Sequence, residues 1–446
     1  MRFHILHAAT SPVPLSFRTI VQGIFALVLG ILMNATTVQG QQIDSGVDVD
    51  KRTIQALLQR IEQLETAEKQ LLDRVTQLEK AQQGPTQDSA TQSPAHVGTP
   101  SETLPEGQSE AAPEKADASR NLLNIRGFGD YSFHGENLKG SSTSFSLGQI
   151  DLFITSDISD RFRFLTDLVF EKGRGNNYEE DLERVLLEYT YSDYFKLAVG
   201  RYHTAIGYYN LAFRHSRWWQ TATGRPFLFL FEDEGGILPA HNVGVSASGE
   251  IPSGKVGLHY IAEVGNGRAS IPGVQPVQNF VDSNYHKSVD LSFFSRPDAI
   301  QGLQVGFSVY RDVLSPPLSP RVGETILDTY ATLTRSKLEW LNEGLVIRHA
   351  PQGLPRVFNT PGFYTQISQR FGSFRPYLRY QYVNAPDNEP IFLPVYNISV
   401  GLRHGPSVGV RYDATESVAI KLQYDRTDLR RQQAINALAF QLAFAF

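Results

Sequence analysis

Residues 434–446, AINALAFQLAFAF, place an apolar side chain at every second position and end on a phenylalanine. The apolar set is Leu438, Phe440, Leu442, Phe444 and Phe446. Because successive side chains of a strand point to opposite faces, this period of two predicts a strand with one apolar face. Such a strand fits a membrane barrel, with lipid outside and a polar lumen inside, and it also fits a soluble sandwich.

The same alternation recurs upstream of this segment. It is clearest in residues 161–170, 184–191, 375–382, 397–403 and 418–425, where the apolar set is unbroken and the opposite set carries charge. Sixteen or seventeen candidate strands can be counted, and single-chain bacterial barrels close with an even number. With Tyr and Phe at strand ends, as an interfacial belt requires, the pattern predicts an all-β protein. Its main domain would be a transmembrane antiparallel β-barrel of about 16 strands over residues 121–446.

The N-terminus has the pattern of a signal peptide over residues 1–40. Arg2 and Arg18 precede the apolar run 24–32, and Val38-Gln39-Gly40 offers small residues for cleavage. An uncleaved N-terminal helix is the alternative. No other apolar run reaches about 18 residues, so spanning helices are not expected. The chain has no cysteine, which excludes disulfides and thiolate metal sites.

After a short polar lead, 41–50, residues 51–83 predict an α-helical coiled coil that precedes the barrel. Four heptads carry leucine at every d position, and Glu68 interrupts the apolar a positions. Ile at a with Leu at d favours dimers, whereas two copies of a short motif typical of trimers favour three strands. A helix packed on its own barrel is a further alternative. The predicted trimer contacts are Arg60, Ile61, Leu64, Glu65, Arg74, Val75, Leu78 and Glu79.

Residues 84–120 predict a proline-rich flexible linker with no aromatic residue. The segment 41–120 carries 8 Lys and Arg against 14 Asp and Glu, whereas residues 121–446 carry 31 against 32. Such balance gives no support to nucleic-acid binding. The linker and coiled coil would reach into the periplasm, where residues 41–120 would contact the cell wall in a tethering role.

Three segments in order resemble the phosphate-selective porin O and P family: residues 199–207, 260–267 and 304–312. The resemblance covers roughly residues 121–446. It implies a homotrimeric, sixteen-stranded diffusion channel embedded in outer-membrane lipid, in which lumenal arginines and lysines attract anions. One departure matters: the seven lysines of the barrel are scattered singly, so the lysine cluster associated with phosphate selection is not visible.

Arginine is abundant in the predicted barrel, and many arginines fall opposite the apolar stripe. A guanidinium in the lumen binds carboxylate or phosphate bidentately, which predicts a weak anion preference. Alternatively, these arginines form cross-strand ion pairs with carboxylates on the same face. The predicted pore-lining residues are Arg126, Arg161, Arg163, Arg184, Arg375, Arg379, Arg403, Arg411 and Lys421.

Residues 210–240 form a long connection rich in Trp and Phe, which argues against disorder. We expect it either to fold inward as a constriction or to form an external cap at trimer contacts. In the inward arrangement, three arginines face three acidic residues across the narrowest point. These are Arg214, Arg217, Arg225, Glu232, Asp233 and Glu234.

The sequence predicts neither an enzyme, nor a cofactor, nor a metal site. The histidines of residues 121–446 belong to no recognisable catalytic constellation, and no pair has metal-ligand spacing on one strand face. The prediction is therefore an outer-membrane porin of a Gram-negative-type bacterium, passing small hydrophilic solutes, with its N-terminal arm in the periplasm. The alternative is a structural tether that links the barrel to the cell wall through the coiled coil.

Deleting residues 41–120 distinguishes these two functions. A porin keeps its conductance in a planar bilayer without this arm, because the pore belongs to the barrel alone. A tether requires the arm for co-sedimentation with peptidoglycan, and its lumen does not conduct. A silent bilayer from folded full-length protein would reject the pore.

Overall fold

A computed structural model describes the part of the chain that follows residue 122. The described residues are 123–141, 143–173, 177–213, 216–232, 234–270, 282, 284–317 and 319–446. The predicted signal peptide, polar lead, coiled coil with its trimer contacts, and linker lie outside them. These four features, and contact with the cell wall, therefore stay predictions.

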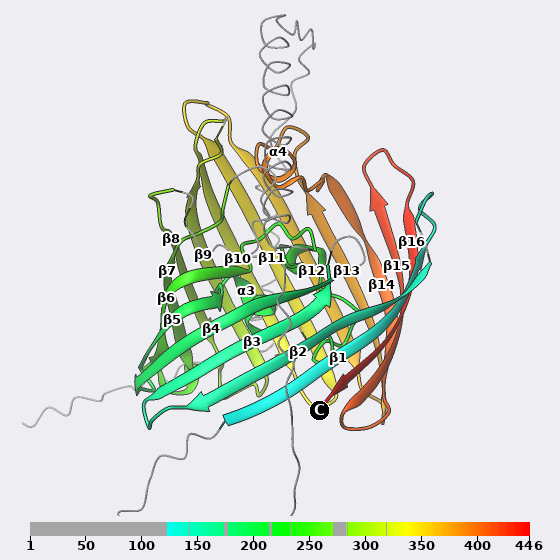
Figure 1. Ribbon diagram of the computed structural model, residues 1–446, viewed down its shortest axis with the longest axis horizontal. Coiled ribbons are helices and arrows are strands. Elements are labelled where there is room, and N and C mark those ends of the chain that lie inside the picture. The colour runs from blue at the N-terminus through cyan, green and yellow to red at the C-terminus, as the bar shows by residue number, and fades with distance from the viewer. Residues whose placement is uncertain are drawn as a thin grey trace, which may run out of the picture. The chain divides into compact units, whose positions relative to one another are not determined.

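The described residues form a closed antiparallel barrel of sixteen strands in which each strand pairs with its sequence neighbours and β1 pairs with β16 (Figure 1). The prediction of a barrel of about 16 strands is confirmed. No helix among the described residues is long and apolar enough to cross a membrane. The strands are β1 Leu123–Glu136, β2 Ser144–Asp157, β3 Phe162–Lys172, β4 Tyr178–Ser192, β5 Phe195–His203, β6 His241–Ile251, β7 Leu258–Gly265, β8 Ser288–Ser295, β9 Leu303–Leu314, β10 Val322–Thr334, β11 Leu338–Pro351, β12 Phe358–Gln369, β13 Phe374–Asn384, β14 Leu402–Asp413, β15 Val418–Leu429 and β16 Ile435–Ala445.

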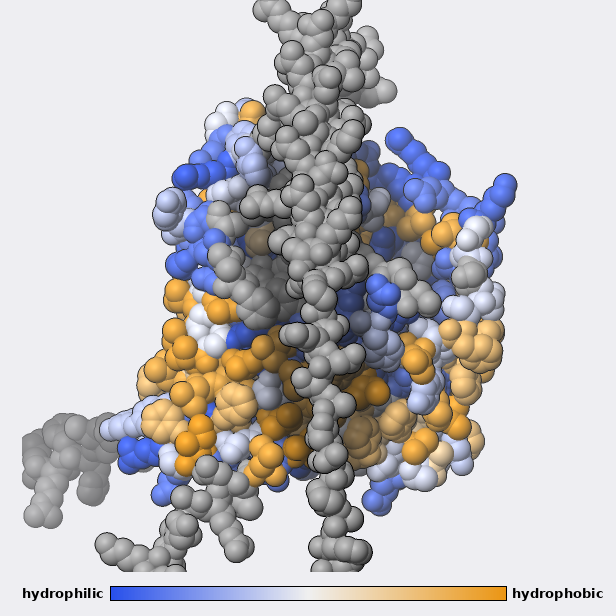
Figure 2. All heavy atoms as spheres, in the orientation of Figure 1, coloured by the Kyte–Doolittle hydropathy of each residue, from blue (hydrophilic) through white to orange (hydrophobic). Residues whose placement is uncertain are grey.

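Alternation along the strands separates an apolar outer face from a polar inner one. In β15, Leu422 and Tyr424 are 46% and 47% exposed, whereas the intervening Lys421 and Gln423 are buried on the lumenal side. In β16, Leu438 and Phe440 are likewise exposed while Gln441 is buried. Figure 2 shows hydrophobic residues gathered over the lower part of the strands and hydrophilic residues at the upper end.

One predicted strand is wrong at its start. Residues 397–401 belong to a connection that follows the short helix α4, Phe392–Tyr396, and Asn397 ends this helix with φ 57°. Ile398 packs against buried apolar residues and Val400 is buried among them, so β14 begins only at Leu402. The local alternation that suggested a strand thus comes from side chains that enter a core inside the barrel.

Connections differ in length between the two rims. One rim carries short turns, such as 193–194, 335–337 and 414–417, together with the start of β1 and the C-terminus (Figure 1). The other carries the longer connections, including 266–287 and 385–401. The short turns include the 3₁₀ helix η2, Gly254–Val256, between β6 and β7.

The connection between β5 and β6, residues 204–240, folds into the lumen, and we call it the inner segment. It contains α3, Gly207–Ala212, and the 3₁₀ helix η1, Phe227–Phe229. Its apolar side chains pack on lumenal side chains of β9 to β13, which gives the barrel a hydrophobic core. This core includes Ile206, Tyr209, Leu228, Phe229, Ile237 and Leu238 from the segment, and Tyr310, Ile326, Leu341, Leu345, Ile347, Tyr364 and Val383 from the wall.

The barrel closes at the aromatic C-terminus. Gly127 and Phe446 exchange two backbone hydrogen bonds of 2.8 Å. The Phe446 ring lies where a side chain of Gly127 would be, since a Cβ built there would stand 2.1 Å from the ring. The Phe444 ring covers Gly129 in the same way. Glycines on the outer face of β1 thus make room for the terminal rings.

Gly127→Val should therefore weaken the pairing of β1 with the C-terminus that closes the barrel, even though valine favours strands. The displaced Phe446 ring loses its packing on β1, which we expect to cost about 1 kcal/mol. The measurement is the temperature at which the folded band converts to the unfolded band on an SDS gel. Gly323→Val is the matched control, because its Cβ would meet nothing closer than 3.7 Å. An equal decrease in both variants would contradict the proposed role of the ring.

Candidate permeation path

Charged side chains on the lumenal wall form two opposed sectors. The acidic sector lies on β7 to β11 and consists of Glu263, Asp290, Asp312, Glu324, Asp328, Glu339 and Glu343, all buried. The basic sector lies on β13 to β15 and consists of Arg375, Arg379, Arg403, Arg411 and Lys421. The inner segment lies between the two sectors and contacts both.

The acidic sector accepts hydrogen bonds from backbone N–H groups at the start of the inner segment. Ala205 N donates to Glu263 Oε2 at 3.0 Å. Tyr208 N and Tyr209 N donate to the Glu343 carboxylate at 2.5 and 3.2 Å. The first N–H groups of a helix have no hydrogen-bond partner within the helix. Glu343 therefore accepts hydrogen bonds from the otherwise unpaired N–H groups at the start of α3.

The basic sector donates hydrogen bonds to backbone carbonyls in the middle of the segment. The bonds run from Lys421 Nζ to the carbonyls of Arg217 (2.6 Å) and Ala222 (3.1 Å), from Arg379 Nη1 to Gly224 (2.8 Å), and from Arg411 Nη1 to Trp218 (2.6 Å) and Gln220 (3.1 Å). Three of the predicted pore-lining cations therefore hold the inner segment in place. Lys421 is fully buried by this contact.

The other predicted pore-lining residues have varied partners. Arg126 and Arg163 line a lumenal cavity, and Arg163 also pairs with Asp157 at 3.4 Å. Arg161 precedes β3 and donates to the Tyr189 hydroxyl at 3.3 Å, on the outer face of the wall. The remaining contacts are Arg184 with Asp167 (2.5 Å), Arg375 with Glu339 (4.0 Å), and Arg403 with the Ser399 carbonyl (3.1 Å) and the Phe227 ring (5.5 Å).

Of the predicted constriction residues, only Arg217 and Glu234 meet as an ion pair among the described residues. Arg214 and Asp233 lie outside the described residues. Arg225 and Glu232 are both buried, so the ring of opposed charges is reduced to one pair lining the upper part of the lumen.

Arg225 stabilises the interior of the segment. It donates to the Phe229 carbonyl and, at 2.9 Å, to the Phe213 carbonyl, and its guanidinium lies 3.9 Å from the Phe231 ring centroid. Burial lowers the pKa of Arg225 to about 10, which still leaves it charged at neutral pH. Glu232 instead accepts hydrogen bonds from His241 N and Nδ1, each at 3.1 Å. Burial alone would raise the pKa of Glu232, but His241 outweighs it and holds this pKa below its usual range.

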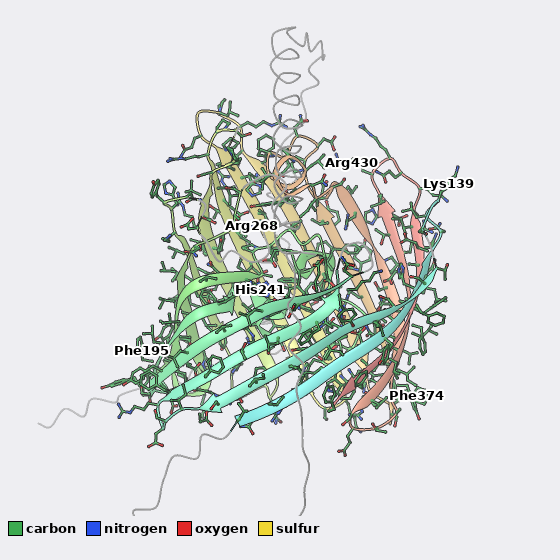
Figure 3. All side chains as sticks on the ribbon, viewed as in Figure 1. Lys139, Phe195, His241, Arg268, Phe374 and Arg430 are labelled. Carbon is green, nitrogen blue, oxygen red and sulfur yellow. The ribbon has the colours of Figure 1, made fainter. Side chains whose placement is uncertain are left out.

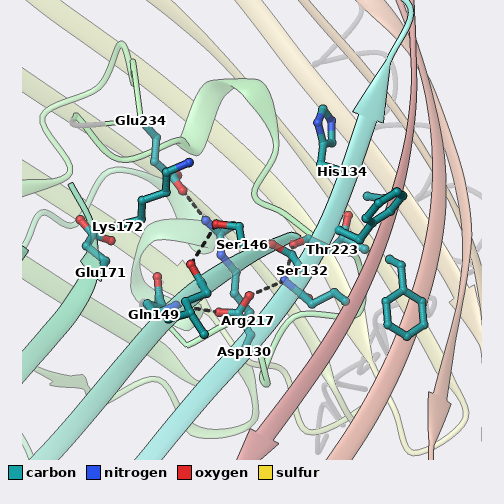
Figure 4. Close-up of a pocket in the computed structure, with 16 residues that line it drawn as sticks. Asp130, Ser132, His134, Ser146, Gln149, Glu171, Lys172, Arg217, Thr223 and Glu234 are labelled. Atoms are coloured by element: carbon teal, nitrogen blue, oxygen red, sulfur yellow. Dashed lines mark hydrogen bonds and ion pairs between the residues drawn. The ribbon is translucent and has the colours of Figure 1, made fainter. Parts of the chain in front are cut away.

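Two cavities flank the inner segment along β1 to β3. The first, of about 510 Å³, is lined by Asn124, Arg126, Phe153, Thr155, Arg163, Leu165, Ala212 and Trp219. The second, of about 390 Å³, is shown in Figure 4, and its lining includes Asp130, Ser132, His134, Gln149, Glu171, Lys172, Arg217, Thr223 and Glu234. The lumenal face of β1 thus places Arg126 in the first cavity and, four residues later, Asp130 in the second.

Between these two positions of β1 lies Phe128, which is buried against Trp219 with ring centroids 5.7 Å apart. Asp130 accepts hydrogen bonds from Gln149 N and Gln441 Nε2, both at 3.1 Å, which fixes its carboxylate beside the Arg217–Glu234 pair. Two packed aromatic rings with fixed charges beside them therefore lie next to both cavities.

A cluster that sequence reasoning missed lies at the root of the inner segment. Glu183 of β4, His203 of β5 and His241 of β6 bring one ligand atom each to within 4.8 Å of the others. Their sequence separations show no metal-ligand spacing because they come from three strands. Only the register of the sheet brings them together.

No model of a known protein family and no curated protein matches the sequence. Among solved structures, the anion-selective porin of Comamonas acidovorans matches with a TM-score of 0.51 at 10% identity, over 73% of this chain and all of that one. The DcaP channel of Acinetobacter baumannii and OmpF of Salmonella typhi match at 0.49, with 9% and 10% identity, over 73% of this chain and 97% and 98% of theirs. At such low identity, the likeness to the Comamonas porin shows a shared fold alone.

Lys421→Met should loosen the inner segment while keeping the strand. The carbonyls of Arg217 and Ala222 lose their donor, and we expect a loss of about 2 kcal/mol in the free energy of unfolding. The unfolding transition on an SDS gel and trypsin cleavage after Arg217 or Arg225 measure this. Lys255→Met, in the exposed η2 turn, is the control. Unchanged cleavage in the Lys421 variant would reject the anchoring role.

Proposed function

We propose that the protein is an outer-membrane porin, a passive diffusion channel for small hydrophilic solutes. The observation that carries this proposal is the pair of polar cavities on either side of the inner segment, along β1 to β3. A barrel of sixteen strands is wide enough for an aqueous lumen. Solutes would pass from one cavity to the other beside Phe128 and Trp219.

Orientation follows from the two rims. Bacterial barrels place short turns and both chain ends in the periplasm and longer loops outside. The rim with the start of β1 would thus face the periplasm, and the arm 41–120 would extend there. The two trimer-type motifs of the predicted coiled coil support a homotrimer.

A weak anion preference is the finer part of the proposal. Many carboxylates of the acidic sector are covered by the inner segment, so they contribute less to the solute path. Arg126 and Arg163 are the charged side chains that line the periplasmic cavity among the described residues. The outer cavity is mixed, with Lys172 and Arg217 against Asp130, Glu171 and Glu234. This arrangement favours anions modestly, without the lysine cluster of a phosphate-selective channel.

Single-channel recording under a salt gradient tests this reading. We expect stepwise conductance in groups of three and a zero-current potential on the anion side. The double variant Arg126→Gln, Arg163→Gln should move that potential toward zero at unchanged folding, because two cations leave the path. Arg161→Gln is the matched control, since Arg161 lies at the same rim but contacts the outer face.

Two results would contradict parts of the proposal. Cation preference in the unmodified protein would reject the anion preference alone. Absence of conductance from correctly folded protein would reject the channel and favour the structural tether.

A further inference from the structure

Two histidines mark the two ends of the inner segment. His203 is the last residue of β5 and His241 is the first residue of β6, directly before and after residues 204–240. The two imidazole rings lie 4.8 Å apart in an edge-to-face arrangement. Glu183 of β4 reaches them from the neighbouring strand, and all three side chains are buried. Figure 3 labels His241 within the barrel.

Both histidines have the nitrogen Nδ1 next to an oxygen acceptor. His203 Nδ1 lies 3.2 Å from the Asn210 carbonyl, and His241 Nδ1 lies 3.1 Å from Glu232 Oε2. A carbonyl accepts only from a protonated nitrogen, so in the neutral ring the lone pair is on Nε2. This is the arrangement that orients metal-binding histidines: the far nitrogen is held by a carbonyl or a carboxylate.

The lone pairs converge on a carboxylate. His241 Nε2 lies 2.6 Å from Glu183 Oε2. With neutral rings, two imidazole lone pairs and a carboxylate oxygen come together in a buried space, which requires a shared proton or a cation. Two histidines and one carboxylate form a ligand set that zinc uses with a fourth position open to water.

We propose that Glu183, His203 and His241 bind one divalent transition-metal ion, zinc in particular. Ligand atoms around tetrahedral zinc stand roughly 3.3 Å apart. The 2.6 Å contact would therefore open by roughly 0.7 Å, and the longer separations, up to 4.8 Å, would close by at most about 1.5 Å. Asn210 and Glu232, both in the inner segment, orient the two histidines from behind.

Arg201 is the competing cation. Its Nη2 atom lies 3.8 Å from Glu183 Oε2, beyond direct hydrogen-bond distance. Glu183 and Glu232 each place a carboxylate directly against His241, at 2.6 and 3.1 Å, and these two contacts favour a cation at the site.

A second Glu–His–Glu arrangement provides a contrast. His349 of β11 contacts Glu324 at 2.9 Å and Glu389 at 2.5 Å, and Arg268 donates to Glu324 at 3.0 Å. There a guanidinium makes the direct contact, and the described residues show no second histidine. The His349 site is therefore an internal control that has the same Glu–His–Glu arrangement, with a directly bonded guanidinium in place of a second histidine.

Metal binding would cross-link His203 at the end of β5 to His241 at the start of β6, and so hold together the two ends of the inner segment. The ion would add stability to a fold that already exists, since the wall hydrogen bonds hold the rest of the segment. This inference does not depend on the channel proposal, because binding can be measured whether or not the protein conducts.

The test uses the full mature chain, folded in detergent and stripped of metal with a chelator that is then removed. Co²⁺ serves as the spectroscopic probe and Zn²⁺ as its competitor. We expect one Co²⁺ per chain, visible d–d bands of a four-coordinate ion, and displacement by Zn²⁺. Bound zinc should also raise the unfolding transition on an SDS gel.

Variants test whether Glu183, His203 and His241 are the residues that bind Co²⁺. His203→Gln and Glu183→Gln should each weaken binding at least tenfold, and Glu232→Gln should weaken it about 10- to 100-fold by releasing the orientation of His241. His349→Gln should leave the affinity unchanged. Retention of the folded SDS-gel band confirms that each variant has folded, and circular dichroism verifies its strand content.

Three results would overturn the proposal. The first is absence of Co²⁺ and Zn²⁺ binding by the folded protein at micromolar metal. The second is binding that His203→Gln and Glu183→Gln leave unchanged. The third is an equal loss in His349→Gln, which would show a general effect of histidine removal. Any of them would leave His241 as a protonated link between two glutamates.

Discussion

Irregular backbone folded into a barrel needs hydrogen-bond partners there, and this requirement shapes the lumen. The inner segment is largely non-helical, so its N–H and C=O groups cannot all pair with one another. Carboxylates on one side of the wall accept from its first N–H groups, and cations on the other side donate to its carbonyls. The two charged sectors are thus complementary to the two kinds of backbone group.

This use of charge determines which parts of the lumen the inner segment fills. A guanidinium such as that of Arg379, buried against the Gly224 carbonyl, is less available to an anion in the lumen. The apolar core between the segment and β9 to β13 fills that part of the lumen. Cavities lie along β1 to β3, where Arg126, Arg163 and Lys172 line them, and another lies beside Tyr208 and Ala212 next to β9 and β10. The off-centre position of the cavities along β1 to β3 therefore follows from how the segment is held.

The sequence predicts well whether a strand residue faces the lumen or the outside of the barrel. It predicts poorly which group that residue binds. Alternation correctly placed Lys421 and Arg411 opposite the apolar stripe, because the period of two is a property of the strand itself. It could not show that their partners are carbonyls about two hundred positions away. It failed at Ile398, where packing under α4 produced an alternating pattern without a strand, and Arg161 lies in a turn where alternation no longer fixes direction. The cluster of Glu183, His203 and His241 depends on register across three strands, which local pattern does not contain.

Two long connections are fixed in a similar way, and the difference between them is informative. The inner segment contributes Glu232 to His241, and the connection 385–401 contributes Glu389 to His349, while a wall glutamate contacts the other nitrogen of each ring. A buried imidazole between two carboxylates is stable only with positive charge nearby. At His349, Arg268 supplies that charge by direct contact with Glu324. At His241 the guanidinium of Arg201 lies 3.8 Å from Glu183 and a second histidine, His203, lies beside the first. A proton or the proposed metal ion would supply the further positive charge there.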